Sequence, residues 1–209
     1  TIRSQAKAEG RYIKQTGGRG QYGHCKIEIS PAPGEGYVFE NDITGGVIPS
    51  KYQEAIEEGI KEAAKKGVLA GFPVMGFKAI VYNGSYHEVD SSDLAFQIAA
   101  SLAFKKVMAE AHPVLLEPIY RLKVLVPQER VGDVLSDLQA RRGRILGMEQ
   151  EGALSVVHAE VPLAEVLEYY KALPGLTGGA GAYTLEFSHY AEVPPHLAQR
   201  IVQERAQEG

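Results

Sequence analysis

A glycine-rich segment near the N-terminus carries the first residue pattern that could bind a ligand. Residues 18–23 read Gly-Arg-Gly-Gln-Tyr-Gly and match G-x-G-x-x-G, which in dinucleotide-binding proteins follows a parallel strand and opens a helix facing a pyrophosphate. A strand pattern follows here instead of a helix, so the context argues against a dinucleotide site. The bare glycine backbone, the cations Lys14 and Arg19, His24 and the ring of Tyr22 favour contacts to phosphates and bases.

A second polar segment, residues 84–92, places serine, histidine and aspartate within a few positions of one another. One hypothesis is a hydrolase in which His87 and Asp90 act with a serine. Against it, the segment contains no G-x-S-x-G nucleophile elbow, and Asp90 or Ser91 already serves as the cap of a following helix. The alternative is an exposed polar loop between a strand and a helix, with His87 at its end.

A third candidate is the basic cluster of Arg141, Arg142 and Arg144 at the end of an expected helix. The helix dipole favours cations there, and binding of an anion or RNA is the alternative explanation. No metal site is expected, because the six histidines are scattered without ligand spacing. The sequence has neither G-x-x-x-x-G-K-[ST] nor Asn-Lys-x-Asp, which argues against GTP hydrolysis by these residues.

The composition, 44% hydrophobic and 23% charged over 209 residues, fits an ordinary folded protein. The net charge of −4 does not indicate nucleic-acid binding, but its distribution is uneven: residues 1–27 carry six basic residues and one acid, which leaves −9 for the rest. This asymmetry fits either a basic contact surface or a strand edge protected by lysines. The single cysteine excludes an intrachain disulfide and suits a reducing cytoplasm, and no apolar run reaches the roughly 18–20 residues that a bilayer span needs.

The pattern of the chain changes near residue 117. In the first region, alternation of apolar and polar residues predicts strands, spacing of three and four predicts helices, and the glycines after residue 16 indicate an irregular hairpin connection. We expect strands over 7–15, 25–30, 37–43 and 74–82, a turn at 83–85, and helices over 49–66 and from a cap at Asp90 or Ser91 to His112. The second of these helices is apolar on much of its circumference and is expected to be well buried.

The second region has the order strand, helix, strand, strand, helix, strand, which is the signature of a ferredoxin-like sandwich. We expect strands over 119–126, 144–149, 154–161 and 183–187, helices over 129–141 and 163–173, and a last helix over 195–206.

Six short strings, in order along nearly the whole chain, resemble elongation factor G. They lie at 15–24, 45–49, 84–92, 115–119, 132–134 with 141–143, and 161–165. The resemblance implies an α+β chain that contains the fourth and fifth domains of this five-domain GTPase family. A ribosomal-protein S5 domain 2-like fold would span 1–117 and a ferredoxin-like βαββαβ sandwich 118–193, with a C-terminal helix at 194–209 that packs on the first domain.

The resemblance also implies a function without catalytic or metal-binding residues in this part of the protein. Two tip loops, 17–24 and 83–90, would enter the ribosomal A-site at the decoding centre of the small subunit, beside tRNA and mRNA, and promote translocation. The implied RNA-contact residues of the loops are Gly18, Arg19, Gly20, Gln21, Tyr22, His24, Ser85, Tyr86, His87 and Asp90. The implied contacts of the second domain with large-subunit rRNA are Arg141, Arg142 and Arg144.

The implied setting is a cytoplasmic monomer that binds the ribosome and no membrane, with GTP and Mg²⁺ held by a GTPase domain outside these residues. A paralogous ribosome-protection or recycling factor is the alternative with the same fold.

The resemblance breaks at 178–182, where the family usually carries a basic residue, then glycine and arginine, and this chain reads Gly-Gly-Ala-Gly-Ala. We expect that loop to make fewer phosphate contacts with large-subunit rRNA.

Overall fold

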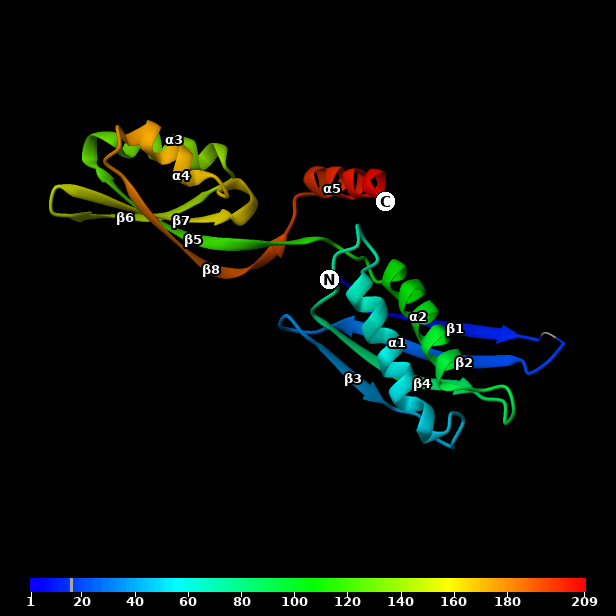
Figure 1. Cartoon of the computed structure of the whole chain (residues 1–209). Coiled ribbons are helices and arrows are strands. Elements are labelled where there is room, and N and C mark those ends of the chain that lie inside the picture. The colour runs from blue at the N-terminus through cyan, green and yellow to red at the C-terminus, as the bar shows by residue number, and fades with distance from the viewer. Residues whose placement is uncertain (16) are drawn as a thin grey trace. The chain divides into compact units, whose positions relative to one another are not determined.

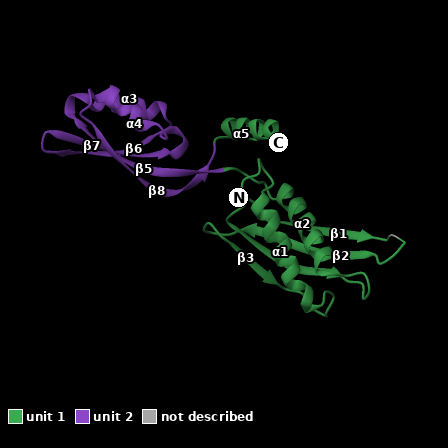
Figure 2. Ribbon diagram, in the orientation of Figure 1, with its two compact units in different colours: residues 1–115, 194–209 green, residues 116–193 purple. Residues whose placement is uncertain are grey.

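The structure is a computed structural model that describes residues 1–15 and 17–209; Thr16, which belongs to the first of the six strings, lies outside the described residues. The chain forms two compact units, unit 1 (residues 1–115 and 194–209) and unit 2 (residues 116–193) (Figure 2). Each unit has its own hydrophobic core. Among the described residues, no helix is long and apolar enough to cross a membrane.

Unit 1 is a four-stranded sheet covered on one face by two helices (Figure 1). The strand order is β1-β2-β4-β3, in which β3 runs parallel to β4 and the other neighbours are antiparallel. The C-terminal helix also belongs to this unit, and the Arg205 guanidinium carbon lies 4.4 Å from the centre of the Phe72 ring. The elements of unit 1 are β1 (Ala6–Lys14), β2 (Gln21–Pro31), β3 (Tyr37–Asn41), a 3-10 turn (Ser50–Tyr52), α1 (Gln53–Lys66), β4 (Phe77–Ser85), α2 (Asp93–Glu110) and α5 (Pro195–Glu208).

The sheet and α2 share the core of unit 1. The alternating residues of β2 predicted to face inward, Cys25, Ile27 and Ile29, are fully buried. The expectation that the second helix is well buried is confirmed, because α2 contributes side chains to the core along its whole length. Its buried residues are Ala95, Phe96, Ala99, Ala100, Ala103, Phe104, Val107 and Met108.

Two strand glycines allow α2 to approach the sheet closely. A Cβ atom at Gly10 in β1 would lie 1.9 Å from the carbonyl oxygen of Ala99, and one at Gly23 in β2 would lie 2.3 Å from that of Ala95. Both distances are far shorter than any van der Waals contact. The helix backbone therefore rests directly on the strand backbone, which is possible only where the strand residue has no side chain.

The expectation of a turn at 83–85 is wrong, because these residues form the C-terminal end of β4. These residues continue the strand: Ser85 lies opposite His24 and Gly84 opposite Cys25, after a register shift in β2. Asn83-Gly84-Ser85 has the composition of a turn, but its pairing with β2 overrides that local preference. The loop after β4 is consequently shorter than predicted and starts at Tyr86.

Helix α2 begins one or two residues later than predicted. Its N-cap is Ser92, whose Oγ accepts the backbone N–H of Ala95 at 3.1 Å. The side chains of Asp90 and Ser91, the predicted caps, instead bind Gly20 in the loop between β1 and β2 and Tyr22 at the start of β2. The residues best suited to cap the helix are thus used to join two loops.

Unit 2 is a four-stranded antiparallel sheet with the order β6-β7-β5-β8 and two helices. This order and the succession of elements are those of the ferredoxin-like sandwich expected from the sequence. The elements are β5 (Leu116–Pro127), a 3-10 turn (Gln128–Arg130), α3 (Val131–Ala140), β6 (Arg144–Glu151), β7 (Leu154–Pro162), a 3-10 turn (Leu163–Glu165), α4 (Tyr169–Thr177) and β8 (Ala182–Glu192).

Helix α4 differs from the helix predicted over 163–173. Residues Leu163–Glu165 form a separate 3-10 turn, and α4 starts at Tyr169 and runs past Pro174 to Thr177. The prediction stopped before the proline, but in this short helix Pro174 removes only one internal hydrogen bond. The helix ends where Gly178 takes a left-handed conformation with φ 64°, which glycine adopts without strain.

Candidate nucleic-acid interface

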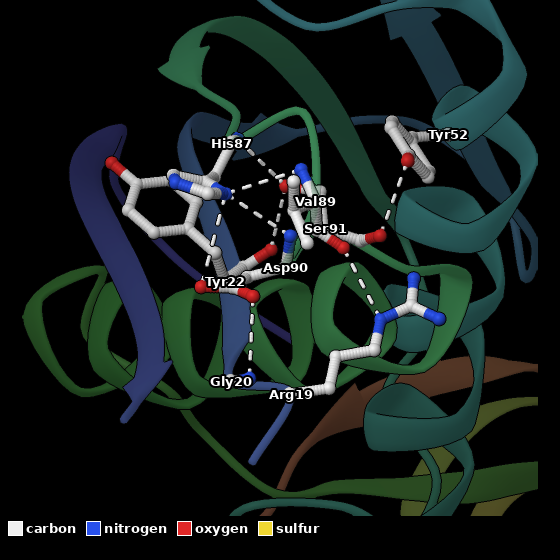
Figure 3. A network of polar contacts seen from close by, with 8 residues as sticks. All are labelled: Arg19, Gly20, Tyr22, Tyr52, His87, Val89, Asp90 and Ser91. Atoms are coloured by element: carbon white, nitrogen blue, oxygen red, sulfur yellow. Dashed lines mark hydrogen bonds and ion pairs between the residues drawn. The ribbon is translucent and has the colours of Figure 1, made fainter. Parts of the chain in front are cut away.

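The loop between β1 and β2 and the loop between β4 and α2 lie side by side at one end of the unit 1 sheet (Figure 1). We call residues 17–20 and 86–90 together the tip. The Tyr22 N–H donates to the Asp90 carbonyl at 3.0 Å, the Gly20 N–H to Asp90 Oδ1 at 3.2 Å, and Arg19 Nε to the Val89 carbonyl at 3.2 Å (Figure 3). Segments about 70 positions apart in the sequence are therefore joined into one surface.

The imidazole of His87 is held in one tautomer by its own loop. Its Nδ1 accepts the backbone N–H groups of Val89 at 3.2 Å and Asp90 at 3.0 Å, and the side chain is 49% exposed. The Asp90 carboxylate lies 3.8 Å from the same nitrogen, which would form an ion pair only with Nδ1 protonated. Two N–H donors at shorter distance favour an unprotonated Nδ1. The neutral ring then carries its proton on Nε2, which is a donor.

One cation and one aromatic ring are exposed on the tip beside this imidazole. Arg19 is exposed, and Figure 3 shows its terminal nitrogens directed away from the contact with Val89. Tyr86 is 41% exposed. Guanidinium groups pair with phosphates and aromatic rings stack on unpaired bases. The exposed tip can thus contact both parts of a nucleotide.

Two of the predicted contact residues, Gly20 and His24, lie beneath the exposed surface of the tip rather than on it. Gly20 is buried, and His24 is only 7% exposed. The ring of His24 lies between Ser85 Oγ, 2.8 Å from Nδ1, and a Glu9 oxygen, 2.7 Å from Nε2. The Tyr22 hydroxyl is 2.7 Å from the same Ser85 Oγ. His24 therefore supports the surface and does not form it, and the half-buried Ser85 links it to Tyr22.

Sequence reasoning did not identify Glu9 as part of this arrangement. In the sequence Glu9 stands out only as the single acidic residue among the basic residues of 1–27. The signal that could have found it is strand pairing: once β1 and β2 form a hairpin, Arg11 pairs with His24 and Glu9 with Lys26. Glu9 is then a near neighbour of His24 on an adjacent strand.

Protonation of Glu9 provides a test of the pair with His24. The hydrogen bond from His24 holds the pKa of Glu9 below its ordinary value of 4.5. The stability gained from this depressed pKa is present above the unfolded-state pKa and is lost as the pH falls through the folded-state pKa. The free-energy difference between wild type and Glu9→Gln should therefore decrease as the pH falls below about 4.5.

Urea unfolding of unit 1 over a pH series measures this difference. Glu35→Gln, in the turn between β2 and β3, removes one negative charge elsewhere in the same unit and serves as the control. A difference between wild type and Glu9→Gln that is the same at acidic and neutral pH would contradict the pairing of Glu9 with His24.

The hydroxyl groups near the tip do not form the pair that a hydrolase based on His87 needs. Ser91 Oγ donates to the Tyr22 carbonyl and accepts the backbone N–H of His87. Ser85 Oγ contacts His24 and Tyr22. Both hydroxyls are engaged away from the His87 ring, so the geometry does not support nucleophilic catalysis there. The described residues also contain no group of three or more acidic, histidine or cysteine side chains arranged to hold a metal.

The arginine cluster of unit 2 is largely engaged within that unit. Arg141 Nε donates to Asp137 at 2.8 Å and its Nη1 to the Glu165 carbonyl at 2.7 Å. Arg142 forms a two-bond pair with Glu117, at 2.7 and 3.0 Å, and a further bond to Glu165 at 3.1 Å. These contacts give both side chains a structural role that the sequence did not reveal.

Arg144 is the exposed member of the cluster. Its side chain is 72% exposed and contacts Glu160 at 2.7 Å. This contact holds the pKa of Glu160 below its ordinary value. Exposed ion pairs of this kind contribute little to stability, so Arg144 can exchange Glu160 for a phosphate at small cost. Of the three predicted rRNA contacts, Arg144 has the geometry most compatible with that role.

Comparison with known proteins agrees with the geometry of both units. The family model described as elongation factor G, domain IV matches residues 1–112, and that described as elongation factor G C-terminus matches residues 114–201. An elongation factor G of Aquifex pyrophilus is 55% identical over 206 residues, which are 98% of this chain and 30% of that protein. A crystal structure of a protein from Thermus thermophilus is 89% identical with a TM-score of 0.88, and the match covers 100% of this chain and 31% of that one.

Proposed function

Because this chain belongs to the elongation factor G family, we propose that its tip enters the ribosomal A-site at the decoding centre of the small subunit and promotes movement of tRNA and mRNA. The chain spans about a third of the length of the relatives it matches. The activity of the whole protein is therefore part of this proposal, with GTP and Mg²⁺ bound by a GTPase domain outside these residues. The factor acts in the cytoplasm as a monomer.

The observation that carries the proposal is the hydrogen-bonded junction between the two loops of the tip. Two bonds join the loops themselves, from Gly20 to Asp90 and from Arg19 to Val89. Two more bonds, from the Tyr22 N–H to Asp90 and from Ser91 to the Tyr22 carbonyl, attach the second loop and its flank to the start of β2. Contact groups held in place before binding lose little conformational entropy when RNA arrives. The Arg19 guanidinium and the His87 Nε2–H group would donate to phosphate or base acceptors, and Tyr86 would stack on a base.

Unit 2 would contact large-subunit rRNA through Arg144. The loop 178–182, where the resemblance implies cations and this chain reads Gly-Gly-Ala-Gly-Ala, would make fewer phosphate contacts. Each lost contact is expected to reduce the salt dependence of ribosome binding by roughly 0.7–0.9 in the slope of log K against log salt.

Replacement of Arg19 or His87 by alanine in the full-length factor tests the tip. Each substitution removes a hydrogen-bond donor to RNA, and a bond to a charged group contributes roughly 1.5–3 kcal/mol. Single-round translocation is therefore expected to slow by on the order of tenfold or more, with GTP hydrolysis on the ribosome nearly unchanged. Lys61→Ala, an exposed cation on α1, is the matched control.

Normal translocation by both tip variants would exclude the tip from the RNA contact. A wild-type full-length factor that does not translocate, but releases a drug or splits ribosomes, would instead favour the paralogous protection or recycling function.

A further inference from the structure

A chain of hydrogen bonds runs under the tip across three strands. It begins at Glu9 on β1, passes through the ring of His24 on β2 and the hydroxyl of Ser85 on β4, and ends at the hydroxyl of Tyr22, with successive distances of 2.7, 2.8 and 2.7 Å. His24 is the central member and is 7% exposed. Both of its ring nitrogens are therefore committed within the protein.

The direction of these bonds depends on the charge of His24. The Glu9 carboxylate can only accept, so His24 Nε2 carries a proton in either state. With a neutral ring, Nδ1 accepts from the Ser85 hydroxyl, and Ser85 Oγ is left to accept from Tyr22. With a protonated ring, Nδ1 donates to Ser85 Oγ, so the Ser85 hydroxyl no longer donates to the ring and is free to donate to the Tyr22 oxygen.

Tyr22 is the residue that this chain of bonds shares with the tip. Its backbone N–H donates to the Asp90 carbonyl at 3.0 Å and its carbonyl accepts from Ser91 Oγ at 2.9 Å. Its ring centre lies 6.1 Å from that of His87, within the range of aromatic pairs. A change in the hydrogen bonding of the Tyr22 hydroxyl thus alters the surroundings of the His87 ring, which is more exposed than that of His24.

We propose that His24 is a positioning residue of the tip, which acts through Ser85 to fix Tyr22 beside His87 and whose proton uptake reorients the Ser85 hydroxyl that contacts Tyr22. Its consequence for RNA rests on the proposed function, but the coupling from His24 to Tyr22 is a property of this chain alone. His24 itself does not contact RNA in this arrangement. The contact is made by the groups that it orients.

The charged groups that face His24 come from both hairpin strands. Glu9 accepts from its Nε2, and Arg11 Nε lies 3.7 Å from the same carboxylate oxygen. Lys26, on the same strand, is paired in register with Glu9. From β4 the facing group is the Ser85 hydroxyl, and α2 packs on the other side of the sheet against Gly23.

Nuclear magnetic resonance of this chain tests the coupling without ribosomes. The ring signals of His24 and Tyr22 are followed over about pH 5 to 8, where imidazoles titrate, with His87→Gln as the background that removes the second nearby imidazole. Tyr22 is expected to shift with the same midpoint as His24. In Ser85→Ala the response of Tyr22 should disappear while His24 still titrates. An unaltered Tyr22 response in Ser85→Ala would overturn the inference.

Two conservative variants of His24 separate its two contacts in the full-length factor. The amide of asparagine reaches the position of Nδ1 and can still accept from Ser85, whereas that of glutamine reaches the position of Nε2 and can still donate to Glu9. Translocation by His24→Asn is expected to stay close to wild type, and His24→Gln should be slower by about fivefold, the effect of one hydrogen bond. Equal rates for the two variants would overturn the positioning role.

The two proposals fail in distinguishable ways. If Arg19→Ala and His87→Ala translocate normally while Tyr22 still follows His24, the proposed function fails and the coupling stands. If the tip variants are slow and Tyr22 does not follow His24, the function stands and the positioning role fails.

Discussion

Gly10→Ala is expected to destabilise unit 1 by about 3 kcal/mol, at the upper end of what overpacking of a core usually costs. The new Cβ atom would lie 1.9 Å from the carbonyl oxygen of Ala99 and 2.7 Å from the backbone nitrogen of Ala103. Both are backbone atoms of α2, so no side-chain rotation relieves the clash and the helix must move off the sheet. The midpoint of thermal unfolding of unit 1 should fall by about 10 °C or more.

A glycine of the tip supplies the matched control for this substitution. A Cβ atom at Gly18 would meet no heavy atom within 4 Å, and Gly18 does not have a positive φ. Gly18→Ala should therefore unfold with unit 1 at the wild-type temperature. Gly23→Ala, with its Cβ atom 2.3 Å from the Ala95 carbonyl oxygen, should resemble Gly10→Ala. A wild-type midpoint for Gly10→Ala would show that α2 is not seated this closely.

The glycines of the first segment show how far sequence reasoning reaches. The prediction that Gly17, Gly18 and Gly20 lie in a hairpin connection is confirmed, but the predicted loop 17–24 is too long, because residues 21–24 already belong to β2 and pair with β1. The string 18–23 also did not show that its glycines serve different purposes. Gly18 is exposed, whereas Gly23 lies against the backbone of α2. That contact joins residues about 70 positions apart, and no local signal encodes it.

The same limit explains the errors around the second loop. Turn-forming residues at 83–85 and capping residues at Asp90 and Ser91 were assigned by local chemistry. In the structure the first group pairs with β2, and the capping residues bind the neighbouring loop. Local preferences of this kind amount to about 1 kcal/mol, which a strand ladder or a loop junction easily exceeds. Mistakes therefore concentrate where the two loops of the tip meet.

The arginine cluster of unit 2 shows a related ambiguity. A string of cations at a helix end is compatible with binding RNA and with pairing inside the protein, and the sequence left both open. The acids that decide the matter, Glu117 and Glu165, lie more than 20 positions from Arg142 on either side. Arg142 also has a left-handed backbone, with φ 58°, so its position is determined by the fold as well as by its charge.

Arg142→Ala is expected to destabilise unit 2 by about 2–3 kcal/mol, because Glu117 would lose a two-bond charged partner while only 13% of its side chain is exposed. Arg142→Gly loses the same contacts but adopts the left-handed backbone without the roughly 1 kcal/mol strain of a residue with a Cβ atom. It should be more stable than Arg142→Ala by about that amount. Urea unfolding of unit 2 measures both.

Arg144→Ala is the counterpart that separates stability from RNA binding. Its exposed pair with Glu160 predicts a change in unfolding free energy below about 1 kcal/mol, but weaker binding to rRNA and a smaller salt dependence. Arg142→Ala should show the reverse wherever unit 2 remains folded. If Arg142→Ala unfolds like wild type and yet binds rRNA less tightly, Arg142 is an RNA contact after all, and its bonds to Glu117 and Glu165 must open when the ribosome is bound.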